Sequence, residues 1–182
     1  MKAYIFMADG FEIIEAFAPI DVLKRCGAEV VTVSIKEDLF VESSQKNTIK
    51  TDTNINEINF KDADVIILPG GAPGYINLRE NEKVVEIVKY FLENDRYVAA
   101  ICGAPTLFAT NNLALGKSLT AHSATQKIFK NTHKYTGTDL HIDGKLITGI
   151  GAGLAIDFGF LIAEQFYDNE IIAKAKKGME LS

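Results

Sequence analysis

The chain has 182 residues, of which 47% are hydrophobic, and a formal net charge of -5. This length supports one well-buried core and is short for two, so we expect a single domain over residues 1–182. Lysine and glutamate are mixed along the chain, without the basic stripe that nucleic-acid binding needs. The apolar runs are too short for a membrane span, or are broken by Asp157 and by glycines. We therefore expect no nucleic-acid partner and no membrane association.

The chain contains only two cysteines, Cys26 and Cys102, which lie far apart in the sequence. The apolar run near the N-terminus, residues 3–8, is too short for a signal peptide and has no cleavage-site context. Two distant cysteines without an export signal do not indicate a disulfide framework. We expect reduced thiols and a cytoplasmic location.

Strand and helix patterns alternate along the whole chain. The patterns predict strands at residues 3–8, 29–35, 64–68, 98–101 and 118–121, and a hairpin of residues 140–142 with 146–148. Helices are predicted at residues 12–25, 81–93, 106–109, 124–130, 155–167 and 169–177. Residues 36–61 are polar with isolated apolar positions, which indicates short edge strands and a surface excursion. The alternation predicts an α/β fold with a mainly parallel sheet.

The loops after the predicted strands are the candidate ligand-binding segments, because ligands of open parallel sheets bind at the carboxyl ends of strands. These loops are residues 9–15, 69–74, 102–105 and 122–123. The second is rich in glycine, which allows the backbone to approach a ligand closely, but it lacks the Lys-Ser or Lys-Thr pair of a phosphate loop. A thiol, a carboxylate and an imidazole are thus expected to converge on one pocket.

Cys102 lies on a predicted sharp turn from strand to helix. The apolar run 98–101 is stopped by Gly103, and Pro105 falls in the first turn of the next helix, where its missing N–H is not needed. Such a corner resembles the nucleophile turn of hydrolases, and a helix N-terminus favours a thiolate. The alternative is a buried core cysteine that packs as a small hydrophobic residue. The turn alone leaves both interpretations open.

Glu15 and His122 are the candidate partners of this thiol. Glu15 shares a helical face with Ala18 and Val22, which allows a buried acid, although a single glutamate is more often a solvated surface residue. His122 follows a predicted strand and is a candidate general base, or else a donor or acceptor to a backbone group. His133 and His141 have no partner at a useful spacing, so we expect surface positions for both.

Neither a metal nor a cofactor is expected. Cys102, His122 and a third ligand have no characteristic metal-site spacing. Residues 149–153 resemble a dinucleotide fingerprint, but no second strand–helix–strand unit follows them, so they predict a tight turn from strand to helix.

Four ordered blocks of the sequence resemble a known family. They are residues 10–27, which begin Gly-Phe-Glu-Ile-Ile-Glu, then Leu-Pro-Gly-Gly at 68–71, Ala-Ala-Ile-Cys-Gly-Ala-Pro-Thr at 99–106 and Leu-Thr-Ala-His at 119–122. These blocks are similar to those of the DJ-1/PfpI family, and most similar to its DJ-1 branch, some of whose bacterial members are called ThiJ. The resemblance runs through essentially the whole chain. It implies a flavodoxin-like, doubly wound domain with helices on both faces of the sheet, usually assembled as a homodimer.

The resemblance also assigns roles to the candidate residues. It implies a reactive Cys102 that is hydrogen-bonded to a protonated Glu15, with His122 nearby and the backbone amides of Gly71 and Gly103 as an oxyanion hole. The implied activity is cofactor-free glyoxalase III or deglycase chemistry on small carbonyl substrates such as methylglyoxal. Redox sensing through oxidation of the cysteine and chaperone action are the implied alternatives.

The sequence departs from the family pattern in two respects. The peptidase-like branch has a histidine directly after its nucleophilic cysteine, whereas this chain has Gly103, which argues against a peptidase. Some DJ-1 proteins have arginines at the positions that align with Gln45 and Ile150, where they help to hold an anion. Their absence here argues against recognition of anionic substrates.

Overall fold

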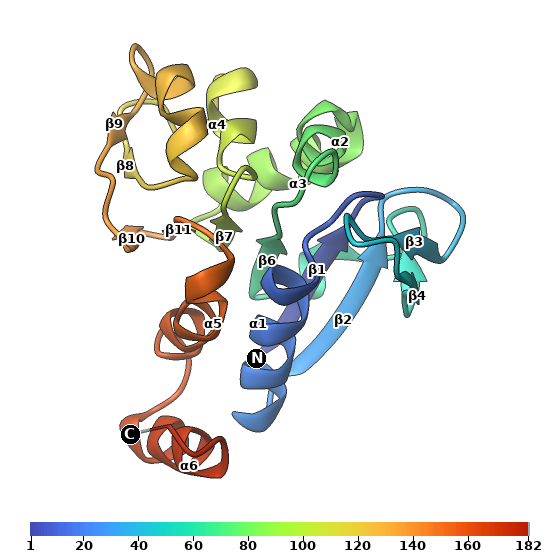
Figure 1. Cartoon of the computed structure of the whole chain (residues 1–182), viewed down its shortest axis with the longest axis vertical. Coiled ribbons are helices and arrows are strands. Elements are labelled where there is room, and N and C mark those ends of the chain that lie inside the picture. Colours follow the sequence, from blue (N-terminus) through green and yellow to red (C-terminus); the bar gives the residue numbers. More distant parts are fainter. Residues whose placement is uncertain (182) are drawn as a thin grey trace.

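A seven-stranded, mainly parallel sheet forms the centre of the computed structural model, which describes residues 1–181. Its strands are β1 (Lys2–Met7), β2 (Glu29–Ser34), β5 (Thr53–Asn54), β6 (Val65–Leu68), β7 (Tyr97–Ile101), β10 (Leu140–Asp143) and β11 (Leu146–Gly149). Their order across the sheet is β10-β11-β7-β6-β1-β2-β5, and Figure 1 labels this row from β10 to β2. Every neighbouring pair is parallel except β10 and β11, which form the predicted antiparallel hairpin.

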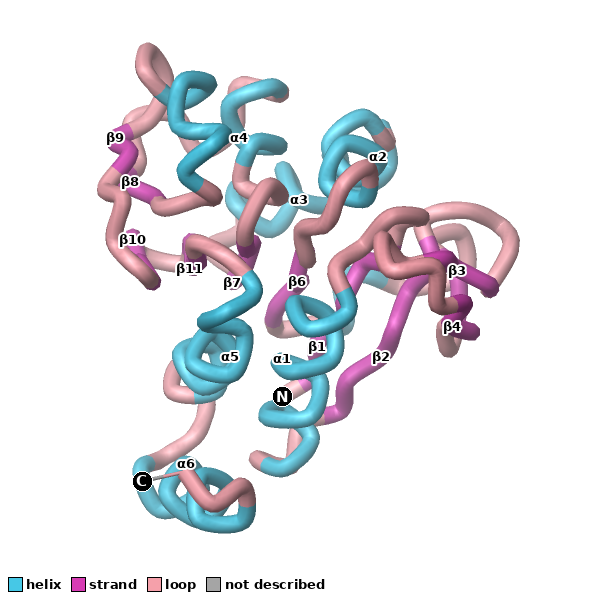
Figure 2. The backbone as a smooth tube through the Cα atoms, in the orientation of Figure 1, coloured by secondary structure: helices cyan, strands magenta, loops and turns pink. Residues whose placement is uncertain are grey.

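Helices cover both faces of this sheet, as Figure 2 shows. One face is covered by α1 (Ile13–Arg25), α5 (Ala155–Ala163) and α6 (Asn169–Gly178). The other face is covered by α2 (Gly74–Glu80), α3 (Glu82–Glu93) and α4 (Thr106–Thr110). The prediction of an α/β fold with a mainly parallel sheet and helices on both faces is confirmed, while that of a single domain over residues 1–182 stays a prediction.

The core consists of two apolar clusters, one on each side of the sheet. Successive residues of a strand point to opposite faces, so Phe6 of β1 belongs to the cluster under α3, and Ile5 and Met7 belong to the cluster under α1. All three side chains are fully buried. Burial on both faces explains why the central strands are continuous apolar runs in the sequence.

The remaining elements are short and peripheral. They comprise the hairpin of β3 (Phe40–Glu42) and β4 (Thr48–Lys50), the pair β8 (Ser118–Leu119) and β9 (Lys134–Tyr135), and the 3-10 helices η1 (Phe60–Asp62), η2 (Ser123–Phe129) and η3 (Ala152–Leu154). The predicted edge strands between residues 36 and 61 are confirmed as β3, β4 and β5. The predicted tight turn at residues 149–153 is confirmed as the connection from β11 through η3 to α5.

Several predicted boundaries differ from the structure. Helix α2 and strand β9 were not predicted, the strand predicted at 118–121 is only β8, and the helix predicted at 124–130 is the 3-10 helix η2. The helix predicted at 155–167 ends at Ala163. Beyond that point the backbone changes to the tighter 3-10 pattern, in which Phe166 N–H donates to Ala163 O, and the Phe166 ring packs edge-on against Tyr97.

The prediction of a surface position is wrong for His133. Its side chain is only 8% exposed, with Nδ1 2.9 Å from Thr132 Oγ1 and Nε2 2.9 Å from the carbonyl oxygen of Leu113. His141 is half-buried, and its Nε2 lies 2.9 Å from Ser118 Oγ. Each histidine therefore has at least one partner that is distant in sequence, Leu113 for His133 and Ser118 for His141.

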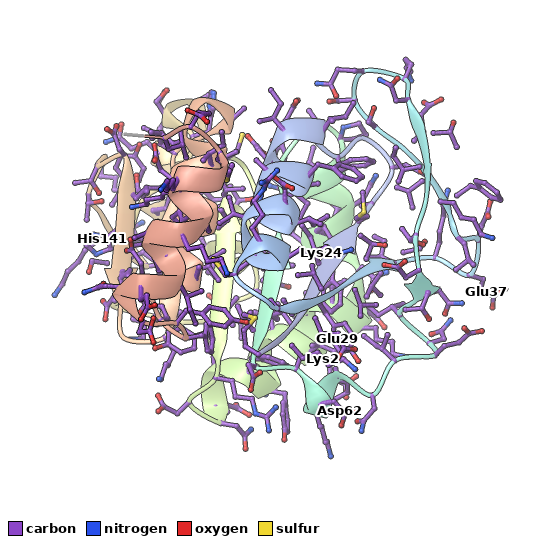
Figure 3. All side chains as sticks on the ribbon, turned by 90° about the horizontal axis from the view of Figure 1, so that it is seen from below. Lys2, Lys24, Glu29, Glu37, Asp62 and His141 are labelled. Carbon is purple, nitrogen blue, oxygen red and sulfur yellow. The ribbon has the colours of Figure 1, made fainter. Side chains whose placement is uncertain are left out.

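The order β2-β1-β6-β7-β11 is that of a flavodoxin-like sheet, whose topological switch point lies between β1 and β6. The loops that follow these two strands, together with the residues after β7, therefore meet at the carboxyl ends of the strands. At the amino ends of the strands, on the opposite side of the molecule, Lys2 Nζ lies 3.0 Å from Glu29 Oε1 (Figure 3). Within residues 1–181, no helix combines the length and the apolar character that crossing a membrane requires.

Candidate active site

Cys102 occupies the corner between β7 and the segment that leads into α4. Its φ of 63° lies in the left-handed region, which costs a residue other than glycine about 1–2 kcal/mol. The backbone is held in this conformation from both sides, because Cys102 N–H donates to Gly149 O at 2.9 Å and Cys102 O accepts from His122 N–H at 2.8 Å. The corner predicted from the sequence is thus a strained position that neighbouring segments stabilise.

The Cys102 sulfur has three hydrogen-bonding partners. The carboxyl group of Glu15 contacts it from α1, and the backbone N–H groups of Gly71 and Gly103 both donate to it. The two N–H donors lower the pKa of the Cys102 thiol, because they stabilise negative charge on sulfur. The residue is partly exposed, so a small molecule can reach the sulfur.

Glu15 is a buried acid, as its helical face indicated. It lies in the first turn of α1, its side chain is 1% exposed, and Oε2 accepts a hydrogen bond from Gly70 N–H at 2.8 Å. Burial raises the pKa of Glu15 to about 7, although the hydrogen bonds from Cys102 and Gly70 act in the opposite direction. The carboxyl group can therefore gain or lose a proton near neutral pH.

Glu15 and Cys102 form a coupled pair. Burial, followed by the negative charge of an ionised Glu15, raises the pKa of the Cys102 thiol to about 12. Two acids in contact lose their first proton as a unit, so the pair retains one shared proton over a wide range above pH 7. When that proton is on Glu15, the carboxyl group is neutral and no longer repels a charge on sulfur. The hydrogen bonds from the N–H groups of Gly71 and Gly103 to the sulfur remain, and they stabilise the thiolate.

Gly70 separates the acid from the thiol and has to be a glycine. A Cβ atom at this position would lie 2.5 Å from Glu15 Oε2 and 2.6 Å from Cys102 Cβ. Any side chain would force the two groups apart. The glycine-rich loop predicted to approach a ligand thus also permits the contact between Glu15 and Cys102.

His122 lies at the edge of the same pocket. It precedes η2, its side chain is exposed, and Nδ1 accepts a hydrogen bond from Ala124 N–H at 3.3 Å. The ring thus binds a backbone group and also lines the pocket, and its role as a general base stays a prediction. Among the hydrogen bonds of residues 1–181, none joins the His122 ring to the Cys102 thiol.

The pocket around the thiol has a volume of about 210 Å³. Its walls are Gly71, Ala72, Tyr75, Cys102, Gly103, His122, Ala124 and Thr125. The sequence indicates Gly71, Cys102, Gly103 and His122 individually and Ala72 as part of the loop 69–74, and it does not indicate Tyr75, Ala124 and Thr125. The available signal for these three is proximity in sequence, because Tyr75 follows the loop and the other two follow His122.

The pocket wall carries no lysine or arginine. Gln45 is exposed, and its Nε2 lies 2.5 Å from Oε2 of Glu12, while Ile150 is half-buried. The two positions expected to lack an anion-binding arginine therefore contribute no positive charge. Within residues 1–181, no three side chains of histidine, cysteine, aspartate or glutamate form a group that could hold a metal ion.

A thiol on a strand-to-helix corner, paired with a buried acid at the edge of a flavodoxin-like sheet, defines a cysteine-centred α/β protein. The model of the DJ-1/PfpI family matches residues 1–165. The chain therefore belongs to the DJ-1/PfpI family, within its DJ-1 branch.

Named relatives support this assignment. The chain is 32% identical over 179 residues to Protein dj-1beta of Drosophila melanogaster, covering 98% of this chain and 96% of the relative. The crystal structure of Drosophila DJ-1beta superposes with a TM-score of 0.95 at 31% identity, covering 100% of this chain and 98% of that one. Protein DJ-1 homolog B of Arabidopsis thaliana is 36% identical over 178 residues, or 97% of this chain, but the chain spans only 39% of that relative's length.

A more distant relative is named as a protease. The putative cysteine protease YraA of Bacillus subtilis is 26% identical over 148 residues, covering 81% of this chain and 87% of the relative.

Proposed function

We propose that this protein is a cofactor-independent glyoxalase III- or deglycase-type enzyme that acts on small α-oxoaldehydes such as methylglyoxal. The observation that carries the proposal is the Cys102 thiol in contact with the buried carboxyl of Glu15, with the N–H groups of Gly71 and Gly103 directed at the sulfur. This arrangement supplies a nucleophile, a proton carrier and two donors for negative charge within one small pocket.

The first step is attack of the Cys102 thiolate on the aldehyde carbon. A carbon–sulfur bond forms, and the electron pair of the carbonyl bond moves to the oxygen. The sulfur loses its negative charge as this happens, so the N–H groups of Gly71 and Gly103 become available to the new oxyanion. Glu15 then donates its proton to that oxygen and gives a neutral hemithioacetal.

The second step moves a proton between the two adjacent carbons. The ionised Glu15 removes the proton of the former aldehyde carbon, an enediol forms, and the proton is returned to the second carbon while the hydroxyl proton passes between the oxygens. The product is a thioester of a 2-hydroxy acid on Cys102. A general acid–base works best when its pKa lies near the operating pH, and Glu15, with a pKa of about 7, meets that condition. The free Nε2 of His122 is the alternative carrier.

The third step is hydrolysis of the thioester. Water adds to the thioester carbonyl, the carbon–sulfur bond breaks, and the sulfur leaves as a thiolate that again shares a proton with Glu15. Methylglyoxal and water thus give lactate, with no net oxidation and no cofactor.

Lactate formation from methylglyoxal tests this mechanism directly. We expect turnover in the wild-type protein and none above the uncatalysed rate in Cys102→Ser, which lacks the nucleophile. Glu15→Gln, which lacks the proton carrier, should lose about 10²–10⁴-fold in rate. Cys26→Ala is the matched control, because Cys26 is the other cysteine and lies outside the pocket. A wild-type rate in either Cys102→Ser or Glu15→Gln would contradict the mechanism.

The pocket argues against the peptidase activity named for YraA. A Cβ atom on residue 103 would lie 2.6 Å from Cγ of Tyr75, so a histidine after the nucleophile does not fit beside this ring. The ring therefore occupies the region into which a side chain at position 103 would extend. This favours small carbonyl chemistry over hydrolysis of peptides.

A redox sensor is the second candidate function, and the same contacts support it. A partly exposed Cys102 is open to peroxide, and a protonated Glu15 together with the N–H groups of Gly71 and Gly103 would donate to the oxygens of a sulfinate. Mass spectrometry after mild peroxide treatment separates the candidates. Selective oxidation of Cys102 without measurable turnover would favour the sensor, or a chaperone switched by that oxidation.

We also propose that the protein forms a homodimer in the cytoplasm. Ile14 is 53% exposed at the start of α1, and Ile156 is 38% exposed at the start of α5, so the neighbouring helices α1 and α5 present apolar side chains that a second copy would cover. Both Cys26 and Cys102 are unpaired, which supports a reducing compartment. Light scattering should give the mass of two 20.0 kDa chains.

A further inference from the structure

Tyr75 forms one wall of the thiol pocket. It lies in the first turn of α2, and its N–H donates to Gly71 O at 2.8 Å, so its position is tied to the loop that also supplies an N–H to the sulfur. Its side chain lines the pocket together with Cys102 and Gly103. The mechanism proposed above gives this residue no chemical step.

The Tyr75 ring packs directly on the backbone of Gly103. A Cβ atom at residue 103 would be 2.6, 2.7 and 3.0 Å from Cγ, Cδ1 and Cδ2 of the ring. A point almost equally distant from these three atoms lies over the face of the ring rather than at its edge. The ring can therefore occupy this position only because residue 103 has no side chain.

Arg79 packs against the same ring from one turn further along α2. Its guanidinium carbon lies 5.6 Å from the ring centroid, within the range of a cation–π contact. Its buried Nε has no hydrogen-bond partner in the part of the chain that the structure describes, and its carbonyl oxygen accepts from Asn111 Nδ2 at 3.0 Å. The ring is thus restrained by the Gly103 backbone and by the Arg79 side chain.

We propose that Tyr75 is the specificity-determining residue of this pocket and that it limits the size of the group that can reach Cys102. The volume of about 210 Å³ is below the roughly 300–1,000 Å³ of pockets that take drug-sized ligands. The substrate class is therefore short-chain, uncharged oxoaldehydes, with larger substituents excluded by the ring. The substrate part of this inference rests on the proposed function, whereas the size limit at the thiol does not.

The ratio of kcat/KM for a small and a bulky oxoaldehyde tests the part of the inference that concerns the substrate. We compare kcat/KM for methylglyoxal and phenylglyoxal in the wild type, Tyr75→Ala and Tyr75→Phe. Tyr75→Ala should shift the ratio toward phenylglyoxal by about tenfold or more, the scale on which a pocket discriminates substituent size, while Tyr75→Phe keeps the ring and the wild-type ratio. An unchanged ratio in Tyr75→Ala would overturn the assignment.

The contact between Tyr75 and Gly103 provides a second test. Gly103→Ala should lower the rate at least about tenfold when Tyr75 is present, because the new methyl group displaces the ring, and should lower it much less in Tyr75→Ala. Additive effects of the two substitutions would show that the ring and residue 103 do not share this space, and would contradict the proposal.

Alkylation of the thiol separates a failure of this proposal from a failure of the proposed function. The rates for iodoacetamide and for the bulkier N-phenyl iodoacetamide are measured at Cys102 by peptide mass spectrometry, which requires no turnover. Tyr75→Ala should raise the relative rate of the bulky reagent about tenfold. The control is Tyr90→Ala, whose ring packs 5.2 Å from that of Phe60 outside the pocket and should leave the ratio unchanged. An equal shift in both variants, or none in Tyr75→Ala, would overturn the size limit.

Discussion

The two cysteines lie near opposite ends of helix α1 and differ in exposure, since Cys26 is buried and Cys102 is partly exposed. Cys26 directly follows the helix, whereas Cys102 contacts Glu15 in its first turn. Both pack in the apolar cluster on the α1 side of the sheet. Burial raises the pKa of both thiols. Burial alone therefore does not account for a reactive cysteine in this fold.

The groups that contact each sulfur account for the difference. Cys26 is 4% exposed, and burial raises the pKa of its thiol. It stands at the C-terminal end of a helix, where negative charge is disfavoured. Cys102 has an acid that can take up the proton and two N–H donors that stabilise the thiolate. The comparison supports the proposal that N–H donors and a proton partner, rather than burial, would make the Cys102 thiol reactive.

The two cysteines also differ in backbone conformation. Cys26 has an ordinary helical φ of -79°, whereas Cys102 has a φ of 63° and is held there by hydrogen bonds to Gly149 and His122. The unfavourable conformation of Cys102 projects its side chain into the pocket. Strain of about 1–2 kcal/mol is therefore located at Cys102, the proposed nucleophile.

The largest expected effect concerns the dependence of stability on pH. The folded pKa of Glu15, about 7, lies above the ordinary value of 4.5, so the folded state binds this proton more tightly than the unfolded state. Its contribution is fully present below pH 4.5 and is lost as pH rises through 7, which lowers the free energy of unfolding by about 3 kcal/mol. Urea titrations at pH 5 and pH 8 should show most of this loss in the wild type and in Cys26→Ala, but not in Glu15→Gln. An equal loss of unfolding free energy in Glu15→Gln would show that another titrating group causes the pH dependence.

The next effect is on the reactivity of Cys102 as a function of pH. Loss of the first proton from the Glu15–Cys102 pair activates the thiol, so the rate of iodoacetamide alkylation should rise through an inflection near pH 7. In Glu15→Gln no proton can be passed to residue 15, and the inflection should move above about 8.5, with a rate at pH 7 lowered roughly tenfold or more. Mass spectrometry of the Cys102 peptide, in samples quenched at successive times, gives the rates for both proteins. An inflection that stays near pH 7 in Glu15→Gln would show that the acid does not control the thiol.

Local patterns of the sequence predict only part of the site. An apolar run stopped by Gly103 and Pro105 predicts the Cys102 corner, and the spacing of Glu15 with Val22 on one helical face allows a buried acid, but the pairing of the two residues comes from the family resemblance. The central strands were equally clear, because burial on both faces makes them continuous apolar runs.

The walls of the pocket could not be predicted in the same way. Tyr75 belongs to α2, a helix of 7 residues that begins within the glycine- and proline-rich loop and is too short to show a periodic pattern. His133 was misplaced because its partner Leu113 is 20 residues away and its ring packs edge-on against Phe129. The contact with Leu113 joins segments that are 20 residues apart, and a single sequence does not reveal such a contact.

The smallest expected effect is that of removing Cys26 itself. Cys26→Ala removes only a buried sulfur, so it should cost about 1 kcal/mol of stability, near the typical value for a point substitution. Cys26→Ser should cost more, because its hydroxyl would be buried in an apolar cluster without a hydrogen-bond partner. Thermal unfolding measures both losses, and the alkylation rate of Cys102 should stay within about twofold of the wild type in Cys26→Ala. If that rate fell together with stability, the reactivity of Cys102 would depend on the packing of the whole α1 face, and the contrast between the two cysteines would no longer follow from their immediate partners.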